Sequence, residues 1–149
     1  MENFKIDQFK AKGNIAFPWF KSLSTEECLN ISQRWRAVMQ CELGVSDLDL
    51  MNIILSKSEV IKNCSSEDTN FDLSALFMRL GVASNEKVYL NWYRFDRIDE
   101  MLLKDLTLHF NDIWYPSSDD LDIFDASYKW LISVAHHGQV THWKSNERD

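Results

Sequence analysis

The sequence has few residues that allow tight backbone turns around a ligand, with four glycines and two prolines among 149 residues. Neither a Gly-rich phosphate loop nor a G-x-S-x-G nucleophile elbow occurs. The three cysteines, Cys28, Cys41 and Cys64, are odd in number and include no C-x-x-C pair. A disulfide framework is therefore not expected, and the pattern favours free thiols in a reducing cytoplasm.

Long hydrophobic runs are also missing. No stretch approaches the roughly 18 apolar residues of a membrane span, and the start, Met-Glu-Asn-Phe-Lys, lacks the apolar core of a signal peptide. Hydrophobic residues make up 45% of the chain and charged residues 26%, which are ordinary globular values. We expect a single cytoplasmic domain over residues 1–149, without a membrane partner.

Basic residues are scarce in one part of the chain. The formal net charge is −7, and between Asp96 and Asp125 only Arg97 and Lys104 oppose nine acidic residues. Because nucleic-acid binding depends on clustered lysine and arginine, this balance argues against a direct nucleic-acid ligand and favours a basic partner. The nine acids are Asp96, Asp99, Glu100, Asp105, Asp112, Asp119, Asp120, Asp122 and Asp125.

Helical periodicity dominates the first half of the chain. Ser24 with Glu27 predicts a capping box at the start of a helix that ends near Gly44. A second helix is predicted from Ser46 or Asp47 to about Ile61. After a polar loop over 63–70, a third helix is predicted from about 71 or 72 to Gly81.

Strand patterns dominate the second half. We predict strands over 87–95, 120–124, 129–135 and 139–143, with a tight turn at His137-Gly138 and one helix from Asp99 to about 114–115. The chain is therefore expected to be an α+β domain. Its N-terminal helices, within about 1–81, would pack on one face of an antiparallel sheet formed mainly by the C-terminal half, about 86–143.

Four histidines are candidates for a catalytic or metal site: His136, His137 and His142, with His109 nearby in sequence. Adjacent strand residues point to opposite faces, so His136 and His137 cannot both serve one metal unless the turn intervenes. The aspartates from Asp119 to Asp125 lack the Gly and Glu of a calcium-binding hand. No metal or cofactor is predicted, and the chain is not expected to be an enzyme.

The acidic stretch begins beside two aromatic residues, Trp114 and Tyr115. Tyrosine and tryptophan next to charge are typical anchors of protein interfaces. Asp120 and Asp122 are expected to share one strand face. The stretch therefore indicates an acidic binding surface or simply a solvated acidic face, and core packing remains an alternative for the aromatic residues.

A family resemblance lies in the C-terminal part of the chain. It is carried by the segment from Ile113 to Asp125, which reads IWYPSSDDLDIFD, and then by Ser127, the run from Trp130 to Val134 and His136-His137-Gly138. It resembles small bacterial immunity proteins that are encoded beside polymorphic or contact-dependent growth inhibition toxins. The similarity extends from about Asn91 to Trp143. It implies stoichiometric inhibition of a cognate toxin domain, commonly a nuclease, with no catalytic residues.

A nuclease must be basic to hold phosphates, so an acidic protein with aromatic anchors can attract it and cover its active face. The toxin-binding residues would then be Asp112, Trp114, Tyr115, Asp119, Asp120, Asp122 and Asp125. Two alternatives stay open. One is a small hydrolase-like enzyme that uses His136 or His137 with a carboxylate, which a pocket joining them would favour; the other is an adaptor domain for another cellular protein.

Overall fold

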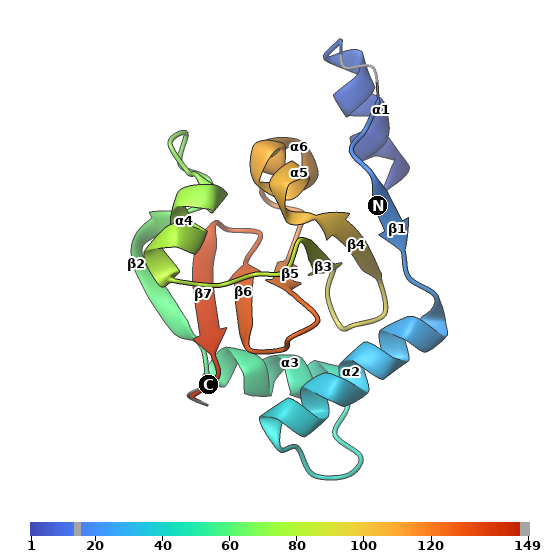
Figure 1. The fold of residues 1–149 in the computed structure, drawn as a ribbon, viewed down its shortest axis with the longest axis vertical. Coiled ribbons are helices and arrows are strands. Elements are labelled where there is room, and N and C mark those ends of the chain that lie inside the picture. Colours follow the sequence, from blue (N-terminus) through green and yellow to red (C-terminus); the bar gives the residue numbers. More distant parts are fainter. Residues whose placement is uncertain (14–15, 147–149) are drawn as a thin grey trace.

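One antiparallel sheet of seven strands organises the chain in the computed structural model, which describes residues 1–13 and 16–146 (Figure 1). The strand order is β1-β4-β3-β5-β6-β7-β2. The strands are β1 (Phe20–Ser22), β2 (Glu59–Ser65), β3 (Lys87–Asn91), β4 (Ile98–Leu102), β5 (Leu121–Phe124), β6 (Trp130–Val134) and β7 (Gln139–Lys144).

Helices lie on both sides of this sheet. They are α1 (Asn3–Ala11), α2 (Thr25–Met39), α3 (Asp47–Ser56), α4 (Leu73–Leu80), α5 (Leu103–Leu108) and α6 (Phe110–Ile113). In Figure 1, α2 and α3 lie below the strands, α5 and α6 lie above them, and α4 overlaps the upper parts of β2 and β7. Helices α4, α5 and α6 share one hydrophobic cluster with the sheet, and α2 and α3 share the other. The α+β class, with mostly N-terminal helices and mostly C-terminal strands, is confirmed. Helices were expected on one face of the sheet, but the structure has helices on both faces.

Two hydrophobic cores result, because successive side chains of a strand point to opposite faces. On the side of α2 and α3, Trp35 is fully buried and packs edge-on against Phe124, Tyr128 and Trp143. The other core joins α4, α5 and α6 to the opposite strand face. Its central members include Leu76, Leu90, Leu106, Ile123 and Ile132.

Local sequence explains the ends of the main helices. Ser24 and Glu27 form the predicted capping box of α2, and the Ser46 side chain accepts a hydrogen bond from the amide of Asp49 at the start of α3. Helix α4 begins at the Asp72 cap and ends at Gly81, whose left-handed conformation suits glycine. Helix α2 ends at Gln40, four residues before the predicted stop at Gly44.

We expect Ser24→Ala to lower the free energy of unfolding by about 1 kcal/mol, because the amide of Glu27 loses its acceptor. Urea unfolding of the variant measures this. Ser84→Ala is a control, since the Ser84 hydroxyl bonds only the neighbouring Asn85 carbonyl and caps no helix. Equal stability of wild type and Ser24→Ala would show that the cap contributes nothing.

Several strands and helix boundaries differ from the sequence predictions. The strand predicted over 87–95 ends at Asn91, because Tyr93, Arg94 and Phe95 adopt positive φ angles that no strand has. The helix expected from Asp99 to about 114–115 is instead β4 followed by the short helices α5 and α6. The second predicted helix stops at Ser56, and β2 occupies Glu59–Ser65, part of which was expected to be loop. Strand β1 had no sequence signal. The predicted strands near 120–124, 129–135 and 139–143 are confirmed as β5, β6 and β7.

None of the helices in the described parts of the chain combines the length and apolar character needed to cross a membrane.

Candidate functional site

A pocket of about 340 Å³ lies between helix α3 and the sheet. Its volume falls in the range of roughly 300–1,000 Å³ that is common for ligand pockets. The helix contributes Leu48, Met51, Asn52 and Leu55, whose i, i+3, i+4, i+7 spacing places them on one face. The sheet and its loops contribute polar groups, which include Asp120, Asp122, Ser133, His137 and Thr141.

A row of polar residues crosses four neighbouring strands beneath α3, and three of them, Asp122, Ser133 and Thr141, line the pocket. Asn91 pairs with Asp122, Asp122 with Ser133, and Ser133 with Thr141, so the four side chains follow one another across β3, β5, β6 and β7. The Asn91 side-chain amide donates to one oxygen of Asp122 at 2.9 Å, and the Ser133 hydroxyl donates to the other at 2.5 Å. The strand register alone brings these residues together.

Asp122 is the acidic residue of this row, and its pKa is shifted. Burial raises its pKa from an ordinary 3.8 to about 6; the hydrogen bonds from Ser133 and Asn91 oppose the rise, and the negative charge of Asp120 adds to it. Both hydrogen-bond donors are neutral, so the ionised carboxylate has no counter-ion in either of them. Keeping an acid here costs folding stability, which is a common property of functional sites.

Thr141 adds an unsatisfied group to the same pocket. Its side-chain oxygen is buried without a hydrogen-bond partner among the described residues, and the residue is only 9% exposed. A buried hydroxyl in this state costs about 1–3 kcal/mol relative to a satisfied one. The pocket lining therefore includes a carboxylate and a residue whose buried hydroxyl has no partner among the described residues.

The loop between β3 and β4 forms part of the pocket mouth through Tyr93. Tyr93, Arg94 and Phe95 all have positive φ angles, of 87°, 56° and 58°. Side chains other than glycine rarely adopt this conformation, and such strain gathers at functional sites. Asn91 holds the loop, because its side-chain oxygen accepts a hydrogen bond from the Phe95 amide at 3.0 Å. One residue thus orients both Asp122 and the loop.

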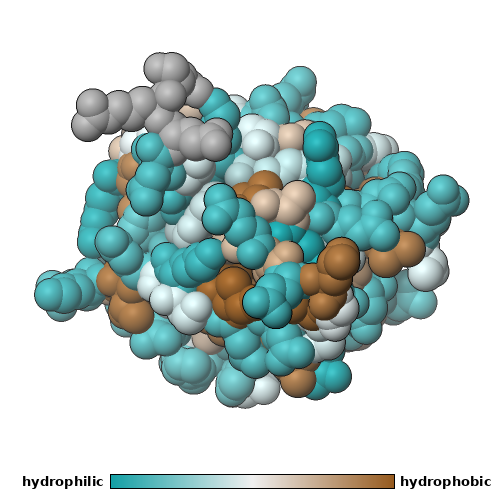
Figure 2. All heavy atoms as spheres, turned by 90° about the horizontal axis from the view of Figure 1, so that it is seen from below, coloured by the Kyte–Doolittle hydropathy of each residue, from teal (hydrophilic) through white to brown (hydrophobic). Residues whose placement is uncertain are grey.

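Exposed hydrophobic side chains surround the pocket. Leu48 is 42% exposed, Leu55 46% and Tyr93 39%, although all three line it. Val60 of the neighbouring strand is 54% exposed and is paired with Thr141, so its side chain lies on the same face of the sheet. Figure 2, which views the molecule from the side of α2 and α3, shows hydrophobic areas within a mostly hydrophilic surface. We call Leu48, Leu55, Val60 and Tyr93 the pocket rim.

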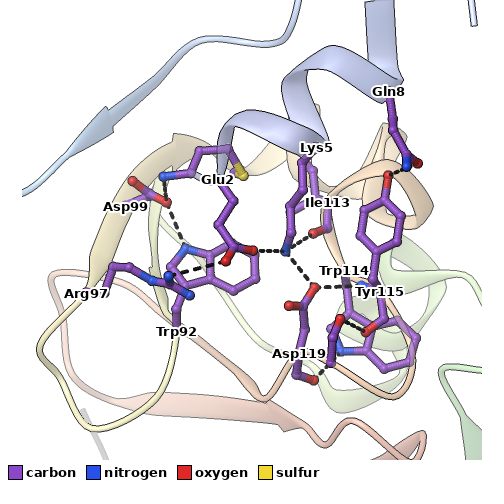
Figure 3. A network of polar contacts seen from close by, with 12 residues as sticks. Glu2, Lys5, Gln8, Trp92, Arg97, Asp99, Ile113, Trp114, Tyr115 and Asp119 are labelled. Atoms are coloured by element: carbon purple, nitrogen blue, oxygen red, sulfur yellow. Dashed lines mark hydrogen bonds and ion pairs between the residues drawn. The ribbon is translucent and has the colours of Figure 1, made fainter. Parts of the chain in front are cut away.

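The structure places several of the predicted toxin-binding residues in the interior. Trp114 is 3% exposed and Asp119 6%, and both belong to a network around the buried Lys5 of α1 (Figure 3). The Lys5 ammonium lies 2.5 Å from an Asp119 carboxylate oxygen, donates to the Ile113 carbonyl at 2.9 Å and lies 3.9 Å from the centre of the Trp92 ring. Asp119 holds α1 through the Lys5 ammonium, and the Trp114 indole donates to the Asp119 backbone carbonyl, so neither side chain is available as a contact for a partner.

Asp122 and Asp125 are also buried, contrary to the predicted acidic surface. Asp125 accepts hydrogen bonds from the backbone amides of Asn85 and Ser127. Strand alternation correctly placed Asp120 and Asp122 on one face, but helix α3 covers that face. The predicted surface is therefore wrong for Trp114, Asp119 and Asp125, while Asp122 enters a different site at the base of the pocket.

The remaining predicted residues are more accessible. Asp112 is half-buried and pairs with Lys12, and the half-buried Tyr115 hydroxyl lies 3.3 Å from the Gln8 side-chain oxygen. The side chain of Asp120 is 44% exposed and contacts the His136 ring at 3.0 Å. Of the seven, Asp120 and Asp122 alone line the pocket.

The histidines do not converge. His136 and His137 lie ring to ring at 5.2 Å at the turn before β7, and His137 but not His136 lines the pocket. His109 lies far away in the fold, against Phe9 of α1. Within residues 1–13 and 16–146, no three histidine, cysteine or acidic side chains lie close enough together to hold a metal ion.

Comparisons of the chain with protein-family models, curated proteins and solved structures gave no significant match. The residues of the pocket and its rim, together with the sequence, are therefore the basis for a functional assignment.

Proposed function

We propose that this chain is an immunity-type protein of the bacterial cytoplasm, which binds a basic toxin domain of the nuclease class and neutralises it by occlusion. It does so through the pocket rim and the pocket beneath α3, without catalysis and without a cofactor. The observation that carries the proposal is the combination of exposed hydrophobic side chains around a concave pocket with a carboxylate at its base.

Exposed hydrophobic residues support a protein partner. Large apolar side chains that gather at one place on a soluble surface are typical of interaction sites, and leucine and tyrosine beside a pocket can form the dry centre of an interface. The exposed surface of Leu48 and Leu55 does not contribute to the stability of the fold. Burial against a partner would remove that surface from water and contribute to affinity.

Charge supports a basic partner. A net charge of −7 attracts a positively charged protein over a distance and accelerates its encounter with the chain. Nuclease domains carry positive surfaces because they hold phosphates. The segment from about Asn91 to Trp143 resembles immunity proteins, and this resemblance supports the same class of partner. The same segment supplies Tyr93, Asp120 and Asp122 to the site.

A small hydrolase-like enzyme is the second candidate, because Asp120, Ser133 and His137 line one pocket. An activated serine needs a base that accepts its proton. The Ser133 hydroxyl donates to the Asp122 carboxylate and not to a histidine, and the histidine that contacts Asp120 is His136, outside the pocket lining, so the described residues form no Ser-His-Asp arrangement. Turnover of model phosphodiesters or esters by the purified chain, lost in Ser133→Ala or His137→Ala, would favour this candidate over the inhibitor.

The double variant Leu48→Glu/Leu55→Glu tests the binding face. We expect it to weaken binding of the toxin domain encoded by the neighbouring gene by about 10- to 100-fold, because two apolar contacts become charged. Both side chains are more than two-fifths exposed, so the fold should persist. Isothermal titration measures the affinity, and rescue of cells that express the toxin domain measures neutralisation.

Met78→Glu is the matched control, since Met78 is 74% exposed on α4, on the opposite side of the sheet. It should bind and rescue like the wild type. Unchanged affinity of the double variant, or an equal loss in Met78→Glu, would contradict the assignment of the binding face.

A further inference from the structure

The pocket beneath α3 has the composition of a site for a long, positively charged side chain. We propose that it receives one lysine or arginine side chain of the protein partner and that Asp122 is the counter-ion. The identity of the partner as a basic toxin domain rests on the proposed function. The chemical preference of the pocket for a cation on an apolar stem can be tested without the partner.

The pocket walls match the stem of such a side chain. Leu48, Met51 and Leu55 form an apolar wall on α3, and the volume of about 340 Å³ is open to the surface between them and the sheet. Lysine and arginine carry methylene stems that pack along apolar surface while the charged head reaches a polar group. A short or purely polar ligand would leave this wall uncovered.

The charge at the base matches the head of the side chain. Asp122 lies under the apolar wall, its two hydrogen-bond donors are neutral, and no ion pair among the described residues involves it. An ionised carboxylate in such surroundings is costly until a cation joins it. Asp120 adds a second negative charge at the mouth.

The charged and titratable groups around the pocket favour a cation. Helix α3 contributes no charged side chain to the lining. Asp122 of β5 and Asp120, which precedes that strand, are the two carboxylates, and the β6–β7 turn contributes His137. Arg94, next to the lining residue Tyr93, stacks on that ring, 4.6 Å from its centre, and is not part of the lining. The described lining thus contains two carboxylates and neither lysine nor arginine.

Thr141 supplies an independent sign of a missing ligand. Its buried side-chain oxygen has no hydrogen-bond partner and lies beside Ser133 in the strand register. An ammonium or guanidinium group carries several donors and no acceptor. Asp122 and Thr141 both line the pocket, so a group of this kind that pairs with Asp122 brings further donors to the lining that also holds Thr141.

Small probes test the pocket on the isolated chain. N-acetyl-arginine methylamide and N-acetyl-lysine methylamide, titrated into ¹⁵N-labelled protein, should shift the amide signals of Leu48, Asp122 and Thr141, with a Kd on the order of 1 mM. The neutral isostere N-acetyl-citrulline methylamide should bind at least about tenfold more weakly, because it lacks the charge that strengthens hydrogen bonds to a carboxylate.

Asp122→Asn should weaken the arginine probe by about 10- to 100-fold, since a charged hydrogen-bond acceptor is lost. Asp125→Asn is the matched control, because Asp125 is a buried carboxylate outside the pocket lining. It should bind the probe like the wild type. Equal binding of arginine and citrulline probes, or equal binding by wild type and Asp122→Asn, would overturn the cation site.

The toxin domain separates this inference from the proposed function. If the wild type neutralises the domain and Asp122→Asn neutralises it at least tenfold less well, the partner inserts its cation as proposed. Equal neutralisation by both proteins would overturn the cation pocket and leave the inhibitor function standing. Failure of the wild type to neutralise the domain would overturn the inhibitor function, and the probe titration then decides the cation site by itself.

Discussion

Replacing Lys5 with alanine is expected to lower the free energy of unfolding by about 3–5 kcal/mol, because the buried Asp119 side chain would lose its cationic partner. The Lys5 side chain is fully buried and touches Asp119, the Ile113 carbonyl and the Trp92 ring. Burial lowers the pKa of Lys5, and the neighbouring Asp119 opposes this shift. Urea unfolding at constant pH measures the loss.

Lys12 provides the matched control for this prediction. It lies at the end of α1 and pairs with Asp112, but its side chain is 56% exposed. Lys12→Ala should therefore change stability by no more than about 1 kcal/mol. A second variant, Lys5→Met/Asp119→Leu, removes both buried charges and should recover much of the stability lost in Lys5→Ala. Similar losses in Lys5→Ala and Lys12→Ala would contradict the role of Lys5 as the group that fixes α1.

Asp122→Asn is expected to stabilise the folded chain at neutral pH by up to roughly 3 kcal/mol. The pKa of Asp122 rises from 3.8 to about 6 on folding, so the folded state holds the proton more tightly than the unfolded state. The contribution of Asp122 to stability is therefore greatest below the unfolded pKa and falls as the pH rises through about 6. Asparagine does not ionise, so the variant does not lose this stability as the pH rises.

Unfolding experiments between pH 4 and pH 7.5 measure the difference between wild type and Asp122→Asn. The difference should grow in favour of the variant as the pH rises to about 6 and then remain constant. Asp120→Asn changes a half-exposed carboxylate of the same strand end and controls for net charge. A difference that does not depend on pH would contradict the buried, ionised state of Asp122. A variant that is more stable but binds less well would place Asp122 in function rather than in folding.

Helix signals close to caps were predictable from sequence, whereas a strand buried on both faces was not. Ser24, Ser46 and Asp72 marked three helix starts correctly because capping is a local property. The sequence of β4 predicts a helix, because Asp99 resembles a cap and apolar residues follow at helical spacing. In the fold Ile98 faces one core and Met101 the other, so no alternation shows in the sequence.

The acidic surface could not be evaluated from sequence because burial depends on the second layer of helices. Strand alternation showed which aspartates share a face, but not that α3 covers it. Lys5, which neutralises Asp119, is 114 residues away in the chain. Only the tertiary structure brings these two charges together.

The pocket left a weak signal that sequence reasoning overlooked. Asp122 and Ser133 each interrupt an otherwise apolar strand, and Thr141 lies in a strand of mixed composition. Each of the three shares its face with a large apolar residue two positions away: Phe124, Leu131 and Trp143. A polar residue at a position expected to be buried is a sign of function. Their alignment into one row depends on strand register, which no single segment encodes.

Amide hydrogen exchange on the complex with the toxin domain tests the central claim most directly, because it shows where the partner covers the chain. Binding through the pocket predicts slower exchange in α3 and in the loop from Trp92 to Arg97, with little change in α4 and α5. Protection confined to α4, α5 or α1, or a complex that leaves α3 and this loop unprotected, would contradict the account.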